Sequence, residues 1–161
     1  MSGSGAPAID PPDAAGLTVT IVASSWHETV MAGLVAGAER TLAAAGVASP
    51  ALVRVPGAFE LPLAAQAAAQ HSDAVVALGV VIRGGTPHFD YVCRAVADGL
   101  MRVALDSGRP VGFGLLTCDS EQQALDRAGL PDSTEDKGAE AAVAALSLAL
   151  TLCHLPSPGQ T

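Results

Sequence analysis

The sequence predicts an α/β protein, a three-layer α/β/α sandwich around a four-stranded parallel sheet. Two observations predict this fold class. Four short runs rich in Val, Ile and Leu alternate with stretches of helical length, and strands that alternate with helices form parallel sheets through right-handed crossovers. The 161 residues, half of them hydrophobic, suffice for one domain with a sizeable core, and no repeat or long linker divides them.

The first half of the chain contributes two strands and two helices. The run LTVTIVA at 17–23 is rich in β-branched residues, and ALVRV at 51–55 precedes a Pro-Gly pair. A helix is expected at about 28–45, where Gly46 suits the position just after the helix. An Ala-rich helix is expected at 60–70.

The second half begins with a nearly continuous apolar run at 74–82, which is typical of a strand covered on both faces. VGFGLLT at 111–117 predicts the fourth strand. The helix between these strands has one apolar face, formed by Val92, Val96, Leu100 and Val103. Together these elements predict a flavodoxin-like arrangement.

Two more helices follow the fourth strand. Ser120 with Gln123 resembles a capping box that opens a short helix, and Ser133 or Thr134 can cap a last helix that reaches about His154. This last helix is apolar around most of its circumference, whereas a surface helix has a polar face. We expect it to be buried against another subunit; the alternative is a plain Ala-rich helix that tolerates water.

Net charge and the length of the apolar runs argue against two classes of partner, nucleic acids and membranes. The net charge is −8 and no Lys/Arg cluster occurs, so we expect no nucleic acid partner, and the apolar runs are too short for a membrane span. We expect a flexible N-terminal arm at 1–16 without a secretory signal, one domain at 17–155 and a C-terminal tail at 156–161. Three cysteines without a CxxC pair indicate reduced thiols in the cytoplasm, and no His/Cys/Asp spacing predicts a metal.

Aromatic residues follow three of the predicted strands. Trp26, Phe59, Phe89 and Tyr91 should converge at the carboxyl edge of the sheet, where open parallel sheets bind ligands. Large residues that merely seal this edge are the simpler interpretation, but their clustering favours a site for a flat ring, with Trp26 stacked on it. Phe113 is the exception, because it lies in the first half of the fourth strand.

The stretch RGGTPHF predicts an anion site at a helix N-terminus. Thr86 suits the N-cap, Pro87 suits the first helical position, and Gly84 and Gly85 let backbone N–H groups approach a ligand. A tight turn with no ligand is an equal alternative, and the stretch is not a Walker P-loop.

Several polar residues beside this edge are candidates for chemistry. His88, beside the anion site, suits proton transfer near neutral pH, and His27 is its rival. Glu60 either favours the helix dipole or accepts hydrogen bonds from a hydroxylated ligand. Composition alone does not distinguish Arg127 and Lys137 from solvated surface charges.

Five stretches in order resemble the lumazine synthase family: SSWHE, VPGAFELP, ALGVVIRGGTPHFDYV, EQQALDRAG and DKGAEAA. The similarity runs from about residue 17 to residue 152. It implies condensation of 5-amino-6-(D-ribitylamino)uracil with 3,4-dihydroxy-2-butanone 4-phosphate to 6,7-dimethyl-8-ribityllumazine, phosphate and water. This is the penultimate step of riboflavin synthesis, and it implies neither cofactor nor metal.

The resemblance also implies roles for individual residues. His88 transfers protons, Trp26 stacks on the ring and Glu60 binds ribityl hydroxyls. The pyrimidine and ribityl positions are Trp26, Ala58, Phe59, Glu60, Val80, Val81, Ile82 and Phe113. The phosphate positions are Gly85, Thr86, Arg127 and Lys137. Phe113 and Arg127 match positions that reach the site from a neighbouring subunit, which implies a homo-oligomer.

Two departures from the family pattern affect this expectation. Gly85 occupies a position that often carries a larger residue, so this loop is expected to be more mobile. The segment AGLPDSTEDKG lacks the compact turn with glycine and asparagine that is common in shell-forming members, which favours a free pentamer.

Two other functions compete with the enzyme. A flavodoxin-like FMN carrier would share the fold, but no Ser/Thr-rich phosphate loop follows the first strand. A non-catalytic flavin-binding or scaffold protein would share the assembly, but it would not need His88 and Arg127.

Overall fold

The structure is a computed structural model that describes residues 10–155. Four parallel strands form one sheet in the order β2-β1-β3-β4. The strands are β1 (Val19–Ser24), β2 (Ala51–Val55), β3 (Ala74–Ile82) and β4 (Val111–Cys118). The predicted fold class, a parallel sheet between two helical layers, is confirmed.

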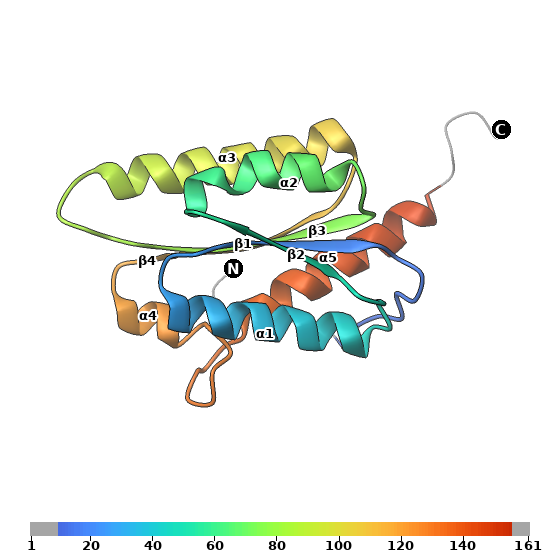
Figure 1. Ribbon diagram of the computed structural model, residues 1–161, viewed down its shortest axis with the longest axis horizontal. Helices are drawn as coiled ribbons and strands as arrows, with labels where there is room; N and C mark the ends of the chain where they lie inside the picture. Colours follow the sequence, from blue (N-terminus) through green and yellow to red (C-terminus); the bar gives the residue numbers. More distant parts are fainter. Residues whose placement is uncertain (1–9, 156–161) are drawn as a thin grey trace.

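Helices cover both faces of the sheet (Figure 1). The helices are α1 (Glu28–Ala44), α2 (Leu61–Ala69), α3 (His88–Ser107), α4 (Glu121–Leu125) and α5 (Lys137–Cys153), with a 3-10 turn η1 (Ala58–Glu60) before α2. Helices α2 and α3 pack together on one face, and α1 and α5 pack together on the other. Of the described helices, none is long and apolar enough to span a membrane.

The apolar circumference of α5 is explained largely by packing within the chain. This helix contacts both α1 and the strands β3 and β4, so a wide arc of its surface is buried. The buried residues are Gly138, Ala141, Ala142, Ala145, Leu146 and Ala149. Leu148 and Leu152 remain exposed, so these side chains are available for the contact with another subunit that we expected.

Two helix boundaries follow the predicted signals, at the end of α1 and the start of α4. Gly46 has φ +78°, and the N–H groups of Gly46 and Val47 donate to the carbonyls of Ala43 and Leu42, which is the Schellman pattern. The Ser120 hydroxyl caps α4 through the Gln123 N–H.

Two capping expectations for the last two helices were wrong. The Gln123 side chain accepts from the Asp119 N–H rather than closing a capping box on Ser120. Helix α5 is capped by Asp136, which accepts from the Ala139 N–H at 2.9 Å. Ser133 and Thr134 instead donate to the carbonyls of Leu125 and Asp126 and hold the turn before α5.

The expected terminal segments lie only partly within the described residues. Residues 1–9 of the expected arm, and the expected tail at 156–161, lie outside them. Within the described part of the arm, Ala14 is buried and its N–H donates to the Ala45 carbonyl at 2.8 Å. The chain is therefore attached to the core before the first strand begins.

Candidate active site

A cavity of about 330 Å³ opens at the carboxyl ends of β1 and β3, and we call it the sheet-end cavity. The chain turns from β1 to β2 on one side and later returns to β3 on the other, so the strand order reverses here. Such switch points are where open α/β sheets bind ligands. The lining residues are Trp26, His27, Gly57, Ala58, Phe59, Glu60, Val80, Val81, Ile82, His88 and Val92.

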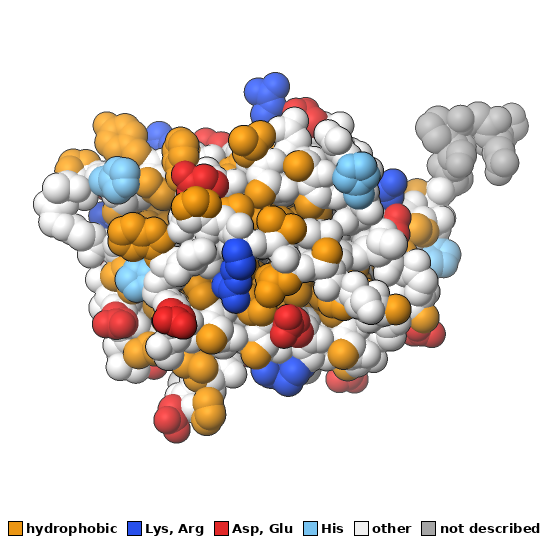
Figure 2. Space-filling view, viewed as in Figure 1, with side chains coloured by type: hydrophobic (Ala, Val, Ile, Leu, Met, Phe, Trp, Pro, Cys, Tyr) orange, Lys and Arg blue, Asp and Glu red, His pale blue; other side chains and the backbone are white. Residues whose placement is uncertain are grey.

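The apolar side chains of this cavity are open to solvent. Trp26 is 69 % exposed and Phe59 is 63 % exposed, which is unusual for side chains of this size. In Figure 2, hydrophobic and histidine side chains gather at the left end of the molecule, where α1 and α3 begin in Figure 1. An exposed indole beside an imidazole provides a stacking surface and a proton carrier for a flat ring.

Helical periodicity decides which residues after β3 reach the cavity. His88 and Val92 are four residues apart on α3, so they share the face that lines it. Phe89 is buried beneath the Arg83 guanidinium, whose central carbon lies 4.1 Å from the ring centre. Tyr91 lines a separate hollow with Asp90 and Arg94. The expectation that Phe89 and Tyr91 join the aromatic edge was therefore wrong.

Glu60 is oriented by the turn that carries it. Its carboxylate accepts a hydrogen bond from the Gly57 N–H at 2.9 Å, and both residues line the cavity. His27 also lines the cavity and has left-handed backbone angles, φ 59° and ψ 64°, at the N-cap of α1. It remains a rival of His88, because both imidazoles border the same space.

The loop between β3 and α3 carries Gly85 and Thr86, both exposed. Helix α3 begins at His88 with Pro87 at the N-cap and no side-chain cap, so the expected N-cap role of Thr86 was wrong by one position. Neither Gly84 nor Gly85 has a positive φ, and a Cβ at either would meet open space. The backbone conformation itself therefore does not require glycine here.

Arg83 ties this loop to the end of β4. Its Nε donates to Asp119 at 2.8 Å and its terminal nitrogen to Asp90 at 3.3 Å, while its backbone N–H donates to the Cys118 carbonyl. The pKa of Arg83 is raised, chiefly by the hydrogen bond to Asp119. Sequence reasoning did not single Arg83 out, because a lone arginine in a loop gives no signal of its partners.

A second cavity of about 340 Å³ runs along β4, and we call it the edge cavity. Its lining residues are Phe113, Gly114, Leu115, Leu116, Thr117, Cys118, Arg127 and Lys137. Phe113 is 51 % exposed on the edge strand. Among the described residues, the two cavities have no lining residue in common.

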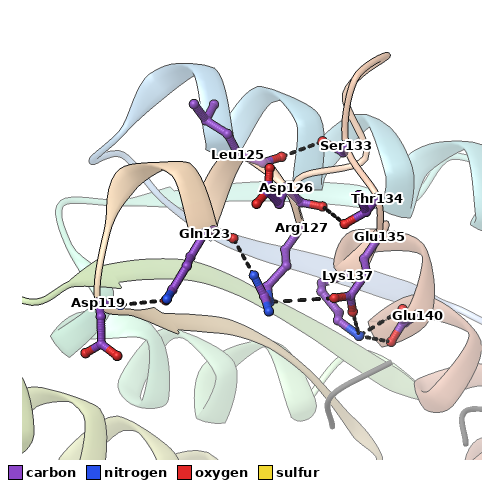
Figure 3. Close-up of polar contacts among 10 residues, drawn as sticks. All are labelled: Asp119, Gln123, Leu125, Asp126, Arg127, Ser133, Thr134, Glu135, Lys137 and Glu140. Atoms are coloured by element: carbon purple, nitrogen blue, oxygen red, sulfur yellow. Dashed lines mark hydrogen bonds and ion pairs between the residues drawn. The ribbon is translucent and has the colours of Figure 1, made fainter. Parts of the chain in front are cut away.

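The polar end of the edge cavity is a network of ion pairs (Figure 3). Arg127 donates to the Gln123 carbonyl at 2.8 Å and lies 3.8 Å from Glu135. Lys137 lies 2.5 Å from Glu135 and 2.8 Å from Glu140. Burial lowers the pKa of Lys137, but its hydrogen bonds to Glu135 and Glu140 outweigh burial, so the pKa is raised. The sequence pattern did not identify Glu135, because its partners Arg127 and Lys137 are brought to it by the turn before α5.

The predicted site residues therefore fall into three groups. Most line the sheet-end cavity: Trp26, Ala58, Phe59, Glu60, Val80, Val81, Ile82 and His88. Phe113, Arg127 and Lys137 line the edge cavity, and Gly85 and Thr86 lie on the loop at the start of α3. Among the described residues, no group of three or more His, Cys, Asp and Glu side chains is arranged to hold a metal ion.

A family profile described as 6,7-dimethyl-8-ribityllumazine synthase matches residues 16–152, which is most of the chain. The chain belongs to this family. Curated relatives with that name are similar over nearly the whole length. The protein from Nocardioides sp. is 67 % identical over 96 % of this chain and 97 % of its own. Those from Leifsonia xyli subsp. xyli and Paenarthrobacter aurescens are 66 % and 62 % identical, each over 94 % of this chain and 97 % and 98 % of their own.

Proposed function

We propose that this chain is a 6,7-dimethyl-8-ribityllumazine synthase. It condenses 5-amino-6-(D-ribitylamino)uracil with 3,4-dihydroxy-2-butanone 4-phosphate, and it releases the lumazine, phosphate and water. Family membership supports the reaction. The observation that carries the assignment to residues is the exposed Trp26 beside His88 in a cavity at the strand switch point.

The sheet-end cavity holds the pyrimidine. The ring stacks on Trp26, the ends of β3 at Val80, Val81 and Ile82 border it, and Glu60 accepts hydrogen bonds from the ribityl hydroxyls. The amine of the pyrimidine forms an imine with the ketone and releases one water, phosphate is eliminated, and the ring closes with loss of a second water. His88 moves protons at the reacting atoms, and holding both substrates together supplies much of the rate.

Phosphate is held by two elements that are far apart in the sequence. Gly85 and Thr86 offer backbone and hydroxyl donors at the start of α3. Arg127 offers a fork of N–H donors from the edge cavity, with Lys137 beside it. In an acidic protein, such local cations are needed to attract an anion against the overall charge.

Each active site is shared between two copies of the chain. The two cavities open on different parts of the surface, so a ring of identical subunits joined head to tail places the edge cavity of one copy against the sheet-end cavity of the next. A free homopentamer is the assembly we propose. The three free cysteines support action in the reducing cytoplasm.

The direct test is to mix the two substrates with purified protein and follow lumazine fluorescence. Turnover above the uncatalysed condensation supports the proposal. An FMN carrier would instead purify with stoichiometric yellow flavin and leave that rate unchanged, so visible absorbance of the purified protein separates the two functions.

The shared site is tested by refolding two variants together. In random mixtures of His88→Ala and Arg127→Ala chains, roughly a quarter of the sites combine an intact His88 half with an intact Arg127 half, as a head-to-tail ring requires. Activity should then exceed that of either variant alone. Mixtures that exchange subunits but show only the average activity would place the whole site within one chain.

A further inference from the structure

We propose that Glu135 is an internal anion that occupies the space between Arg127 and Lys137 and competes with phosphate for these two cations. By this competition Glu135 sets how tightly the edge cavity holds phosphate. The inference rests on the proposed function, in which Arg127 and Lys137 receive the phosphate group. The inference adds Glu135 to the site as a residue that opposes phosphate binding.

The geometry places the Glu135 carboxylate where an anion belongs. One carboxylate oxygen lies 2.5 Å from the Lys137 ammonium, and the other lies 3.8 Å from Arg127 Nε. Figure 3 shows Glu135 lying between the two cationic side chains. A phosphate oxygen and a carboxylate oxygen accept the same charge-assisted hydrogen bonds from these groups, so both cannot use them at once.

The Glu135 side chain is only 20 % exposed, and that of Lys137 only 12 %. Screening by water is therefore weaker here than at an open surface. The hydrogen bond from Lys137, with the nearby charges of Lys137 and Arg127, holds the pKa of Glu135 below its ordinary value. Glu135 is consequently charged at neutral pH, when phosphate arrives.

Glu135 is not needed to hold either cation in place. Arg127 is anchored by its hydrogen bond to the Gln123 carbonyl at 2.8 Å, and Lys137 is anchored by both oxygens of Glu140, at 2.8 and 3.0 Å. A carboxylate whose partners are already positioned by other groups contributes mainly its charge.

Competition of this kind suits a reaction in which phosphate enters on one substrate and leaves as a product. Without an internal anion, the two cations would hold the released phosphate more tightly and slow its departure. Glu135 returns to Arg127 and Lys137 as phosphate leaves, so Arg127 regains its counter-charge while Lys137 keeps Glu140 throughout. The cost is weaker binding of the phosphorylated substrate.

The test is a calorimetric titration of the assembled protein with inorganic phosphate. Glu135→Gln keeps the shape of the side chain and removes its charge, and we expect its Kd for phosphate to fall by about five-fold, the effect of a partly exposed ion pair. Asp132→Asn is the matched control, because it removes one charge from an exposed position of the same turn. Its Kd should change less than about two-fold, since distant surface charges are screened.

Steady-state kinetics give a second readout. In Glu135→Gln, the KM for the phosphorylated ketone and the inhibition constant for phosphate should fall together, while the KM for the pyrimidine is unchanged. Glu135→Asp keeps the charge but draws it back from Arg127, so its phosphate Kd should lie between those of wild type and Glu135→Gln. Glu135→Asp also tests the inference if Glu135→Gln is too unstable to measure.

The outcomes separate this inference from the proposed function. If wild type makes no lumazine but Glu135→Gln still binds phosphate more tightly, the proposed function fails and the competition stands. If Glu135→Gln binds phosphate equally or more weakly than wild type, Glu135 positions the cations and the inference is wrong. Undetectable phosphate binding by both proteins at millimolar concentrations also overturns it.

Discussion

The sheet-end cavity is lined mainly by apolar side chains at the ends of three strands, whereas the edge cavity ends in charged side chains carried by the segment after β4. The first is held by the burial of β1 and β3, whose residues are nearly all inaccessible to solvent. The second depends on one edge strand and on contacts between a turn and α5. Apolar packing provides a surface for a ring, and ion pairs provide a place for an anion.

Asp136 shows how closely the edge cavity depends on local packing. Its carboxylate caps α5, accepts from Arg40 at 2.8 Å, and lies where a Cβ at Gly37 or Gly129 would overlap it. The residue next to it is Lys137. The position of this cation is therefore set by close contact between α1, the turn and α5.

Arg127→Ala should give the largest effect, and it should impair binding in the edge cavity while leaving binding in the sheet-end cavity intact. Loss of a charge-assisted contact costs about 1.5–3 kcal/mol, so the KM for the phosphorylated ketone should rise by about 10- to 150-fold. The KM for the pyrimidine should change little, because Arg127 does not line the sheet-end cavity. Arg109→Ala, at the other end of the sheet, is the control. If Arg127→Ala lost affinity equally for both substrates, the assignment of phosphate to the edge cavity and of the pyrimidine to the sheet-end cavity would be contradicted.

His88→Ala changes the other cavity, and we expect a loss of roughly 10- to 100-fold in kcat, the lower part of the range for a general acid–base group. Proximity of the two substrates supplies the remaining rate. Stopped-flow or steady-state fluorescence of the lumazine measures the change, and His71→Ala at an exposed position after α2 is the control. A folded variant that binds both substrates and shows no turnover would refute this assignment.

Two glycine substitutions compare the packing behind the cavities. A Cβ at Gly138 would overlap the Leu34 carbonyl, so Gly138→Ala should lower the free energy of unfolding by about 1–3 kcal/mol. A Cβ at Gly84 would meet open space, so Gly84→Ala should stay within about 0.5 kcal/mol of wild type. Urea denaturation measures both. Equal stability of the two variants would show that α1 and α5 can move apart.

The last expected effect lies far from both cavities, at Asp73 before β3. Its carboxylate accepts from the N–H and hydroxyl of Thr18 at 2.9 and 2.8 Å, which lowers its pKa, with help from the Arg109 charge. A lowered pKa gives stability that is present above the unfolded pKa and is lost as pH falls through the folded one.

Asp73→Asn should therefore cost about 1 kcal/mol at neutral pH. The difference from wild type should shrink below about pH 4, where this carboxyl group begins to be protonated in the unfolded chain while it is still charged in the folded one. Denaturation at several pH values measures this difference, and the kinetics of both substrates should be unchanged. A difference in the free energy of unfolding that grows as the pH falls would contradict the predicted direction of this pH dependence.

The amino-acid pattern alone is sufficient to predict the fold class and most of the residues that line the sheet-end cavity. Alternation of strands and helices specifies a parallel sheet, and the residues just after its strands must meet at one edge. The sequence alone therefore groups Trp26, Glu60 and His88 at this edge. The five motifs then pointed to the family.

The orientation of α3 and the ion pairs after β4 followed only from the three-dimensional packing. The rotation of α3 turns His88 toward the cavity and buries Phe89, although the residues are adjacent. The turn before α5 brings Glu135 between Arg127 and Lys137 and gives the N-cap to Asp136 rather than to Ser133 or Thr134. The face that a helix presents and the partners in an ion pair depend on helix rotation and on side-chain placement over a few ångströms, and hydrophobic periodicity does not encode these.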